Sequence, residues 1–302
     1  MFLPDTQQSQ ITQNLMPINW VGMSAIHLPL LFPINGNIVL QNVKLDLFVD
    51  LNSHSQRGIH MSRLYLLVQQ EVAGKRLDEI NWSSILNKMV TSQDGLSSQA
   101  MIKLHFDFID QQKALVTEAT GWRSLPVQVQ FKKTEGSDVI QSTQFSVVYS
   151  STCPASTALS LDARVKQFET EWNLKTLNFS GLKSWVGGSS GLVATPHAQR
   201  SFAEVQINSV SAKIKYQSYI EQAEKALKTR VQTAVKRADE QKFAELNAEN
   251  PLFCEDAVRI LAETFRANRE ISAFRLKVRH EESLHAHNAE AVIEHGSFQA
   301  LN

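Results

Sequence analysis

The stretch "NVKLDLFVD" (residues 42–50) alternates between apolar and polar side chains. Its apolar residues occupy every second position: Val43, Leu45, Leu47 and Val49. Because successive side chains of a strand point to opposite faces, this period predicts a β-strand with one buried face. The polar residues Lys44 and Asp46 indicate that the other face is wet, which favours antiparallel over fully buried parallel sheets.

The same period of two recurs in four further segments: 102–108, 127–131, 205–207 and 274–278. Helical spacing predicts two consecutive helices in the second half, over 223–235 and 250–265, the second with Asn250 as N-cap and Pro251 at its first position. In the first half, 77–90 is a helix candidate, and 61–72 fits either a helix or a strand.

Strands, then helices, then strands therefore occur twice along the chain. This order predicts an α+β fold of two similar modules that meet near residue 150. We expect an N-terminal module over 1–150 and a C-terminal module over 151–302, with an inserted loop at about 157–195. The Gly/Ser-rich stretch "WVGGSSGLVATP" (185–196) ends that insert and is typical of a surface loop.

The composition excludes several classes of protein. Thirty basic residues balance thirty acidic ones, so the chain has no overall field that attracts nucleic acid or anionic lipid. Pro29 and Pro33 interrupt the most apolar early run, and the start "MFLPDTQQSQ" has no basic segment before an apolar one, so neither export nor a membrane span is indicated. We expect a cytoplasmic protein with a substantial core, since 43% of its residues are apolar.

Histidine, cysteine and carboxylate residues concentrate in the second half. Cys153 stands directly before a proline at the end of an alternating stretch, and the other candidates are His197 and Glu240. Thiolate, imidazole and carboxylate are the usual protein ligands of zinc, and three ligands plus water make an open catalytic site. Their spacing establishes no metal site, because Cys153 could equally be a core residue, His197 an exposed loop residue and Glu240 a solvated helix charge.

The stretch "ESLHAH" (282–287) is a second cluster. If it forms a strand, His285 and His287 lie on one face and Glu282 on the other unless a bulge intervenes. The two histidines could transfer protons near neutral pH, or they could simply lie on a wet surface.

Glu255 falls in the first turn of the predicted second helix, four residues before Arg259. The helix dipole and this ion-pair spacing explain a carboxylate there in structural terms. The functional alternative is that the carboxylate accepts two parallel N–H bonds from a purine-like ring.

Eight stretches together resemble the type IB family of GTP cyclohydrolase I, in the order of that family and over nearly the whole chain. They are "PDTQ" (4–7), "INWVGMSAIHLPL" (18–30), "GIHMSR" (58–63), "SSTCPAS" (150–156), "TPHAQRS" (195–201), "KRADEQK" (236–242), "NPLFCEDAVR" (250–259) and "ESLHAHNAEAVIE" (282–294). The resemblance implies a tunnelling fold of two tandem antiparallel-sheet modules, each with paired helices. It also implies a homo-oligomer, with a tetramer expected, whose active sites lie between subunits.

The same resemblance implies the site. The metal ligands would be Cys153, His197 and Glu240, holding Zn²⁺, Mn²⁺ or Fe²⁺, and Glu255 would bind the guanine. The cluster of Glu282, His285 and His287 would be catalytic together with Cys153. His60 and Arg63 would contact substrate or an interface, and Arg200 would meet the triphosphate, since a cation must do so.

The reaction implied is the hydrolysis of the guanine imidazole ring of GTP at C8, which gives formate and 7,8-dihydroneopterin triphosphate for pterin and folate synthesis. Two departures matter. Where the family commonly has Cys-Pro-Cys, this chain has Ala155 in place of the second cysteine, and the segment between Ala155 and His197 is longer than in the compact members of the family. Two alternatives therefore stay open, a non-catalytic protein that binds a purine or pterin, and a thiol hydrolase in which His197 activates Cys153.

Overall fold

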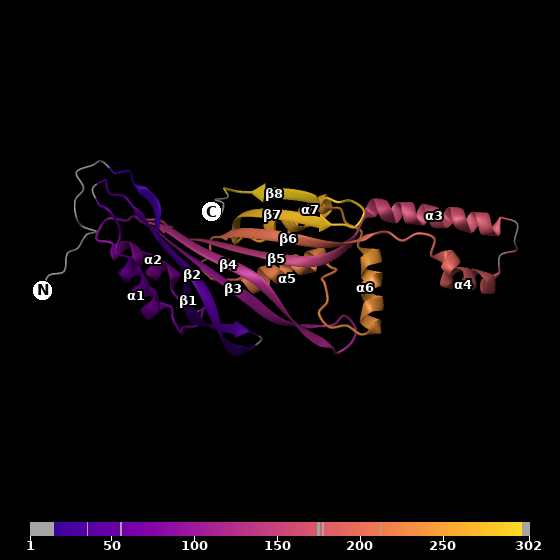
Figure 1. Ribbon diagram of the computed structural model, residues 1–302, viewed down its shortest axis with the longest axis horizontal. Coiled ribbons are helices and arrows are strands. Elements are labelled where there is room, and N and C mark those ends of the chain that lie inside the picture. Colours follow the sequence, from indigo (N-terminus) through magenta and orange to yellow (C-terminus); the bar gives the residue numbers. More distant parts are fainter. Residues whose placement is uncertain are drawn as a thin grey trace.

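A computed structural model describes residues 15–297, apart from 35, 55, 174–175, 177 and 212, so the motif at 4–7 lies outside the described residues. Eight strands form one antiparallel sheet in sequence order: β1 (Ile18–Ile34), β2 (Asn37–Leu51), β3 (Gln99–Lys113), β4 (Thr120–Thr134), β5 (Ile140–Thr152), β6 (Ala198–Ser209), β7 (Ile271–Glu281) and β8 (Ala289–His295). Each strand pairs with the next one along the chain (Figure 1).

The expected fold of two tandem sheet modules is wrong, because the sheet is continuous. The ladder between β4 and β5 runs from Val127 opposite Phe145 to Lys132 opposite Ile140, and it joins the strands of both halves. Pairing these two strands removes two open sheet edges, which would otherwise expose unpaired backbone groups. Residue 150 falls inside β5, and the division of the chain into domains at that point stays a prediction.

Helices account for most of the chain between the strands. They are α1 (Met61–Glu71), α2 (Trp82–Thr91), α3 (Pro154–Trp172), α4 (Phe179–Gly187), α5 (Tyr216–Leu227), α6 (Arg237–Glu249) and α7 (Cys254–Arg266), with the short 3₁₀ helix η1 (Ser189–Gly191). No helix of the described residues is long and apolar enough to cross a membrane.

Two predicted helix boundaries are wrong. The period of four over 223–235 continues past α5, which ends at Leu227, and the separate helix α6 follows. The next helix begins at Cys254 instead of Pro251, because Pro251 pairs with Thr152 of β5 and Leu252 N donates to Thr152 O at 3.0 Å. This pairing fixes the first turn of α7 beside the end of β5.

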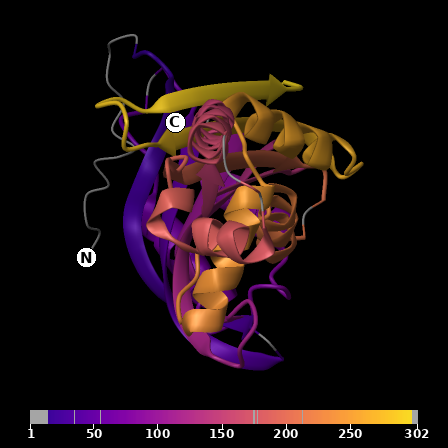
Figure 2. The same cartoon turned by 90° about the vertical axis from the view of Figure 1, so that its right-hand side faces the viewer.

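The core lies between one face of the sheet and the helices. The alternating residues that predicted β2 are all fully buried: Val43, Leu45, Leu47 and Val49. Helix α7 buries Leu261 and Phe265 against the second half of the sheet, and each such side chain contributes about 1.5–3 kcal/mol by leaving water. An end view shows the helices gathered on one side of the curved sheet (Figure 2).

The segment between β5 and β6 is helical where the sequence predicted a loop. Helices α3 and α4 extend beyond the end of the sheet (Figure 1). Their aromatic rings pack on one another, with the centroid of Phe168 5.2 Å from Trp185 and 6.0 Å from Trp172. This small aromatic cluster stabilises the pair of helices away from the main core.

Candidate active site

A pocket of about 420 Å³ opens where β5 ends, where β6 and α7 begin, and where β7 turns into β8. Its lining includes most of the chemistry-bearing residues of the second half: Cys153, His197, Cys254, Glu255, His280, Glu282, His285 and His287. Four segments that are far apart in the sequence thus contribute to one cavity.

Backbone contacts at the end of β5 hold these segments together. Thr152 is the central residue, since its carbonyl accepts from Leu252 N and its hydroxyl donates to Asn247 O, at 3.0 Å each. Cys153 N donates to His197 O at 3.4 Å, and His197 N donates to the hydroxyl of Ser156 at 3.2 Å. The ends of α6 and β5 and the start of β6 are therefore fixed against one another.

Cys153 occupies the N-cap position of α3, and Pro154 is the first residue of that helix. A proline fits there because the first helical N–H groups have no partner within the helix. Cys153 is half-buried and lines the same pocket as His197. The end of the strand therefore contributes a thiol to this pocket.

The carboxylate of Glu282 joins two histidines. Its Oε2 lies 2.9 Å from Nε2 of His197, and its Oε1 bonds to Nδ1 of His285. The hydrogen bond from His285 holds the pKa of Glu282 below its usual range, and the charges of His197 and His287 act in the same direction. Glu282 therefore stays an anion that can orient two imidazole rings at neutral pH.

The stretch 282–288 is a loop between β7 and β8, so the strand that would place both histidines on one face does not form. The rings of His285 and His287 nevertheless stack, with centroids 5.0 Å apart. The loop also explains why Glu282 and His285 meet, since a strand would have pointed them to opposite faces.

Glu255 lies in the first turn of α7 and lines the same pocket. Its own backbone amide and the thiol of Cys254 hold its pKa below the usual range, with a smaller contribution from Arg259. The closest contact of Arg259 is with Asp256, at 3.6 Å. The exposed carboxylate of Glu255 is thus charged and free to accept further hydrogen bonds.

Glu240 does not lie with Cys153 and His197 in the single chain. It is exposed in the first turn of α6, whose other end contacts Thr152 through Asn247. Seven residues of helix separate Glu240 from Asn247, a distance of about 10 Å along the axis. Among the described residues, no group of three or more His, Cys, Asp and Glu side chains could hold a metal ion.

The neighbouring Asp239 has a structural role that the sequence did not reveal. It is fully buried, and its carboxylate accepts from Val116 N, Thr117 N and the hydroxyl of Thr117 at 2.6–2.9 Å. These bonds hold the pKa of Asp239 well below its usual range. They attach the start of α6 to the β3–β4 connection.

The donor types at the pocket fit a divalent cation in part. A thiol and an imidazole, from Cys153 and His197, are ligands that zinc, manganese and iron accept. Both residues line the pocket, and the imidazole of His197 bonds to the carboxylate of Glu282. The predicted third ligand, Glu240, does not line this pocket.

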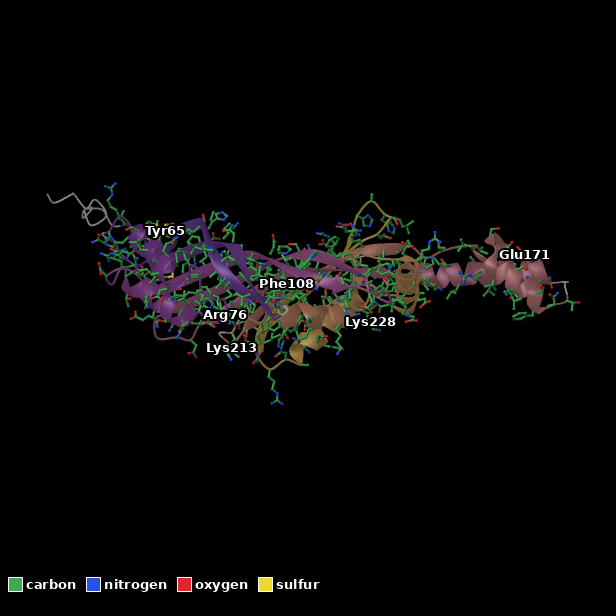
Figure 3. All side chains as sticks on the ribbon, turned by 90° about the horizontal axis from the view of Figure 1, so that it is seen from below. Tyr65, Arg76, Phe108, Glu171, Lys213 and Lys228 are labelled. Carbon is green, nitrogen blue, oxygen red and sulfur yellow. The ribbon has the colours of Figure 1, made fainter. Side chains whose placement is uncertain are left out.

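His60 and Arg63 lie at the other end of the molecule. The β2–β3 and β3–β4 ladders place α1, which follows β2, at the end of the sheet where β5 begins. Twelve strand steps of β5 then separate that end from Cys153, about 40 Å. Figure 3 shows the same separation, with Tyr65 of α1 and Glu171 of α3 at opposite ends.

Arg63 has partners where it lies. Its guanidinium donates to Ser92 O at 2.5 Å and to Asp94 at 2.6 Å, and His60 N donates to Gln93 Oε1 at 2.8 Å. These contacts tie the start of α1 to the turn after α2.

Arg200, the predicted triphosphate contact, is exposed on β6 between the buried residues Gln199 and Ser201. Neighbouring side chains of a strand point to opposite faces, so Arg200 faces away from the side of the sheet on which Gln199 lines the pocket. The structure therefore does not bring Arg200 into the pocket with Glu255.

Three pocket residues were missed by the sequence analysis: Gln199, Cys254 and His280. His280 continues the alternation of Phe274, Leu276 and Val278 on the buried face of β7. That position predicts a buried side chain. The presence of a histidine on an apolar face was the one sequence feature that could have suggested a functional role.

Ionised carboxylates, imidazoles and a thiol in one pocket are the side chains that hydrolytic enzymes use as acids, bases and metal ligands. Residues 3–291 match the protein family described as type I GTP cyclohydrolase FolE2. The chain belongs to this family. The predicted class of enzyme, a GTP cyclohydrolase, is thereby confirmed, whereas the subtype IB stays a prediction.

Three similar proteins carry the name GTP cyclohydrolase FolE2. Those of Pseudoalteromonas atlantica and Bdellovibrio bacteriovorus are 37% and 39% identical to this chain, each over 97% of it and 96% of the relative. The protein of Pseudomonas putida is 40% identical over 96% of the chain and 94% of the relative. Among solved structures, the uricase of Arthrobacter globiformis aligns with 96% of this chain and 98% of its own at 10% identity, with a TM-score of 0.48.

Proposed function

We propose that this chain hydrolyses the imidazole ring of GTP at C8 and yields formate and 7,8-dihydroneopterin triphosphate, as the type IB enzymes are expected to do. The observation that carries the proposal is the Glu282 carboxylate, which joins His197 to His285 in the pocket that also contains Cys153 and Glu255. The pterin product would serve folate synthesis or the synthesis of a modified nucleoside.

Glu255 would bind the base. A guanine edge presents an amide N–H and an amino N–H side by side, and a carboxylate accepts two such parallel bonds. The depressed pKa of Glu255 keeps it in the accepting form at neutral pH. Holding the base still places C8 at the imidazoles of the pocket, which lowers the entropic part of the barrier.

His285 and His287 would transfer protons. Hydration of C8 requires a proton at the neighbouring ring nitrogen as the C8–N9 bond breaks, and a protonated imidazole can donate it. Glu282 orients His285 through their hydrogen bond. A second hydrolysis then releases C8 as formate, and the opened ribose rearranges and closes onto the pyrimidine.

Cys153, His197 and Glu240 would hold a divalent cation, Zn²⁺, Mn²⁺ or Fe²⁺. Such an ion supplies hydroxide at neutral pH by lowering the pKa of water. Because Glu240 lies about 10 Å along α6 from the end of β5, it completes this set only in the assembled protein.

The protein would act in the cytoplasm as a homo-oligomer, with a tetramer expected, whose active sites lie between subunits. The positions of His60 and Arg63 support an interface site, because one chain separates them by about 40 Å from Cys153. Arg200 could likewise meet the triphosphate of a substrate held by a neighbouring copy, since it lies on the opposite face of the sheet from the pocket.

The test is an assay with purified protein, GTP and added Zn²⁺, Mn²⁺ or Fe²⁺, in which the oxidised pterin is measured by its fluorescence. We expect product with at least one of these metals, loss of activity with a chelator, and recovery when metal is returned. Cys153→Ser should lower both bound metal and turnover.

Two results would contradict the proposal and point to the alternatives. Uptake of GTP without product under any metal would favour a non-catalytic purine-binding protein. Activity that survives the chelator and disappears on alkylation of Cys153 would favour a thiol hydrolase.

A further inference from the structure

A layer of buried polar side chains lies beneath Glu255 at the floor of the pocket. Tyr149 and His280 are each 2% exposed, Cys254 is 4% and Gln199 is 7% exposed. Three of the four line the cavity. Buried polar groups are costly unless each has a partner, so such a layer is retained only where its bonds are satisfied.

Cys254 contacts Glu255 directly. Its thiol donates to Oε2 of Glu255 at 3.2 Å. Burial and the adjacent carboxylate raise the pKa of Cys254 to about 11, so the sulfur keeps its proton and remains a donor. This cysteine therefore acts as a hydrogen-bond donor and not as a thiolate.

Hydrogen bonds to both ring nitrogens of His280 fix its tautomer. Nε2 of Gln199 lies 3.0 Å from Nδ1 of His280, and an amide nitrogen can only donate, so Nδ1 accepts. The proton of the neutral ring is therefore on Nε2, which lies 2.8 Å from the hydroxyl of Tyr149. The tyrosine hydroxyl in turn bonds to Ser201.

The network around His280 reaches the start of α7. The amide of Gln199 that donates to the ring also donates to Leu252 O at 3.4 Å, three residues before Glu255. Burial lowers the pKa of His280 to about 4, so the ring is uncharged at neutral pH. The other titratable groups around Glu255 include Arg259 on its own helix and, in the pocket, Cys153, Glu282 and the imidazoles of His197, His285 and His287.

The hydrogen-bond capacity of Glu255 agrees with this arrangement. An ionised carboxylate has about four lone-pair sites. The thiol of Cys254 and the backbone amide of Glu255 use two, and the remaining two match the paired N–H groups of a guanine edge. A carboxylate held at a set angle can accept both of those bonds at once.

We propose that Cys254 and His280 are positioning residues for Glu255 and thereby set the preference for a guanine base over purines that lack the exocyclic amine. The inference rests on the proposed role of Glu255 in binding the base. Cys254 fixes the angle of the carboxylate by its S–H bond, and His280 holds the start of α7, on which Glu255 lies, through Gln199 and Leu252.

The test compares GTP with ITP, whose base lacks the amine, in the metal-loaded enzyme. In Cys254→Ala we expect the ratio of kcat/KM for GTP to that for ITP to fall by about threefold to tenfold, mainly through KM for GTP, because one hydrogen bond to a charged group is lost. Cys254→Ser keeps a donor at the same position and should retain the ratio.

A second pair of variants tests His280. His280→Leu removes both the donor and the acceptor and should lower the same ratio, whereas His280→Gln retains one of each and should retain more of it. Thermal melts of all four variants check that the folded fraction is comparable, and Cys254→Val replaces Cys254→Ala if the smaller side chain destabilises the fold.

Equal losses on GTP and ITP in Cys254→Ala and His280→Leu, with the ratio unchanged, would overturn the inference and leave these residues a packing role. Calorimetric binding of GTP and ITP to the same variants separates this outcome from a failure of the proposed function. If wild-type protein forms no pterin, the ratio of the two dissociation constants still tests the positioning role.

Discussion

Asp50 and Glu282 are carboxylates at opposite ends of the same sheet, and they are used in opposite ways. Asp50 lies near the end of β2, is 2% exposed, and accepts from Ser98 N and Gln99 N at 2.8 Å each and from the side chains of Ser98 and Asn52. Glu282 follows β7, and its partners among the described residues are imidazoles that line a pocket.

The difference shows how a structural carboxylate can be told from a reactive one. Each carboxylate oxygen of Asp50 accepts two hydrogen bonds from groups that the fold fixes in place. This carboxylate therefore stabilises the turn before β3. The partners of Glu282 are imidazoles that line a pocket, and one of them, His285, is open to solvent, so the charge of Glu282 can act on a reaction. Asp239 repeats the first pattern and Glu255 the second.

The largest expected effect is on catalysis at Glu282. Glu282→Gln keeps the shape of the side chain but removes the charge that orients His197 and His285. We expect kcat to fall by about 10²–10⁴-fold, the usual contribution of a general acid or base that is correctly held. Pterin formation at saturating GTP measures it, and retention of most of the activity would mean that the pocket carboxylate is structural like Asp50.

The second prediction concerns His280, a buried ring whose two nitrogens both have hydrogen-bond partners. Its pKa is about 4 in the folded chain against 6.5 for a free side chain, so the unfolded chain binds this proton more readily. Its stabilising contribution is complete above pH 6.5 and is lost as the pH falls toward 4, by about 3 kcal/mol at most.

The measurement is urea unfolding between pH 7 and pH 4 for the wild type and for His280→Gln. The variant should lose less stability over this range, because it has no imidazole to protonate. Parallel curves for the two proteins would show that the ring is not held neutral.

The third prediction tests the structural role of Asp50. Asp50→Asn replaces one acceptor oxygen by an amide NH₂, so the side chains of Ser98 and Asn52 would face a donor, and the free energy of unfolding should fall by about 1–3 kcal/mol. Turnover per folded molecule should not change, because the partners of Asp50 are Ser98, Gln99 and Asn52, none of which belongs to the proposed site. Chemical denaturation and the pterin assay on the same preparation check both parts; a loss of turnover in the folded variant would contradict the distinction.

The smallest expected effect on stability is at Glu240, which is exposed next to the buried Asp239. Glu240→Gln should change the free energy of unfolding by less than about 0.5 kcal/mol, as exposed substitutions usually do. If Glu240 is a metal ligand in the assembled protein, the variant should nevertheless bind less metal. Full metal content in Glu240→Gln would remove Glu240 from the ligand set.

Strands were predictable from the sequence, but their order was not. Alternation of apolar residues identifies a strand with one wet face, and 43–49, 102–108, 127–131, 205–207 and 274–278 all lie in strands. It carries no information on which strand pairs with which, so the ladder between β4 and β5 that makes the sheet continuous was missed.

Helix α3 was missed although it carries a signal. Leu161, Val165, Phe168 and Trp172 follow the spacing of one helix face, but this face packs on α4 outside the main core, and Leu161 and Val165 stay exposed. Helix α7 was predicted with a wrong start, because Pro251 has a tertiary partner in Thr152 that local capping signals do not include.

The candidate site was found through motifs and not through spacing. Cys153, His197, Glu255 and the cluster at 282–287 line one pocket, and only the sheet register brings them together. Gln199 and His280 carried no signal apart from burial, since polar residues on the buried face of a strand resemble any satisfied core residue. Glu240, His60 and Arg63 require more than one chain if they are to reach the pocket.

The most direct measurement follows the carbon atom that the reaction must release. GTP labelled with ¹³C at C8 is incubated with the metal-loaded protein, and labelled formate is followed by NMR. The proposed function predicts one formate per GTP consumed for the wild type and almost none for Cys153→Ser. GTP that is bound or consumed without labelled formate would contradict it.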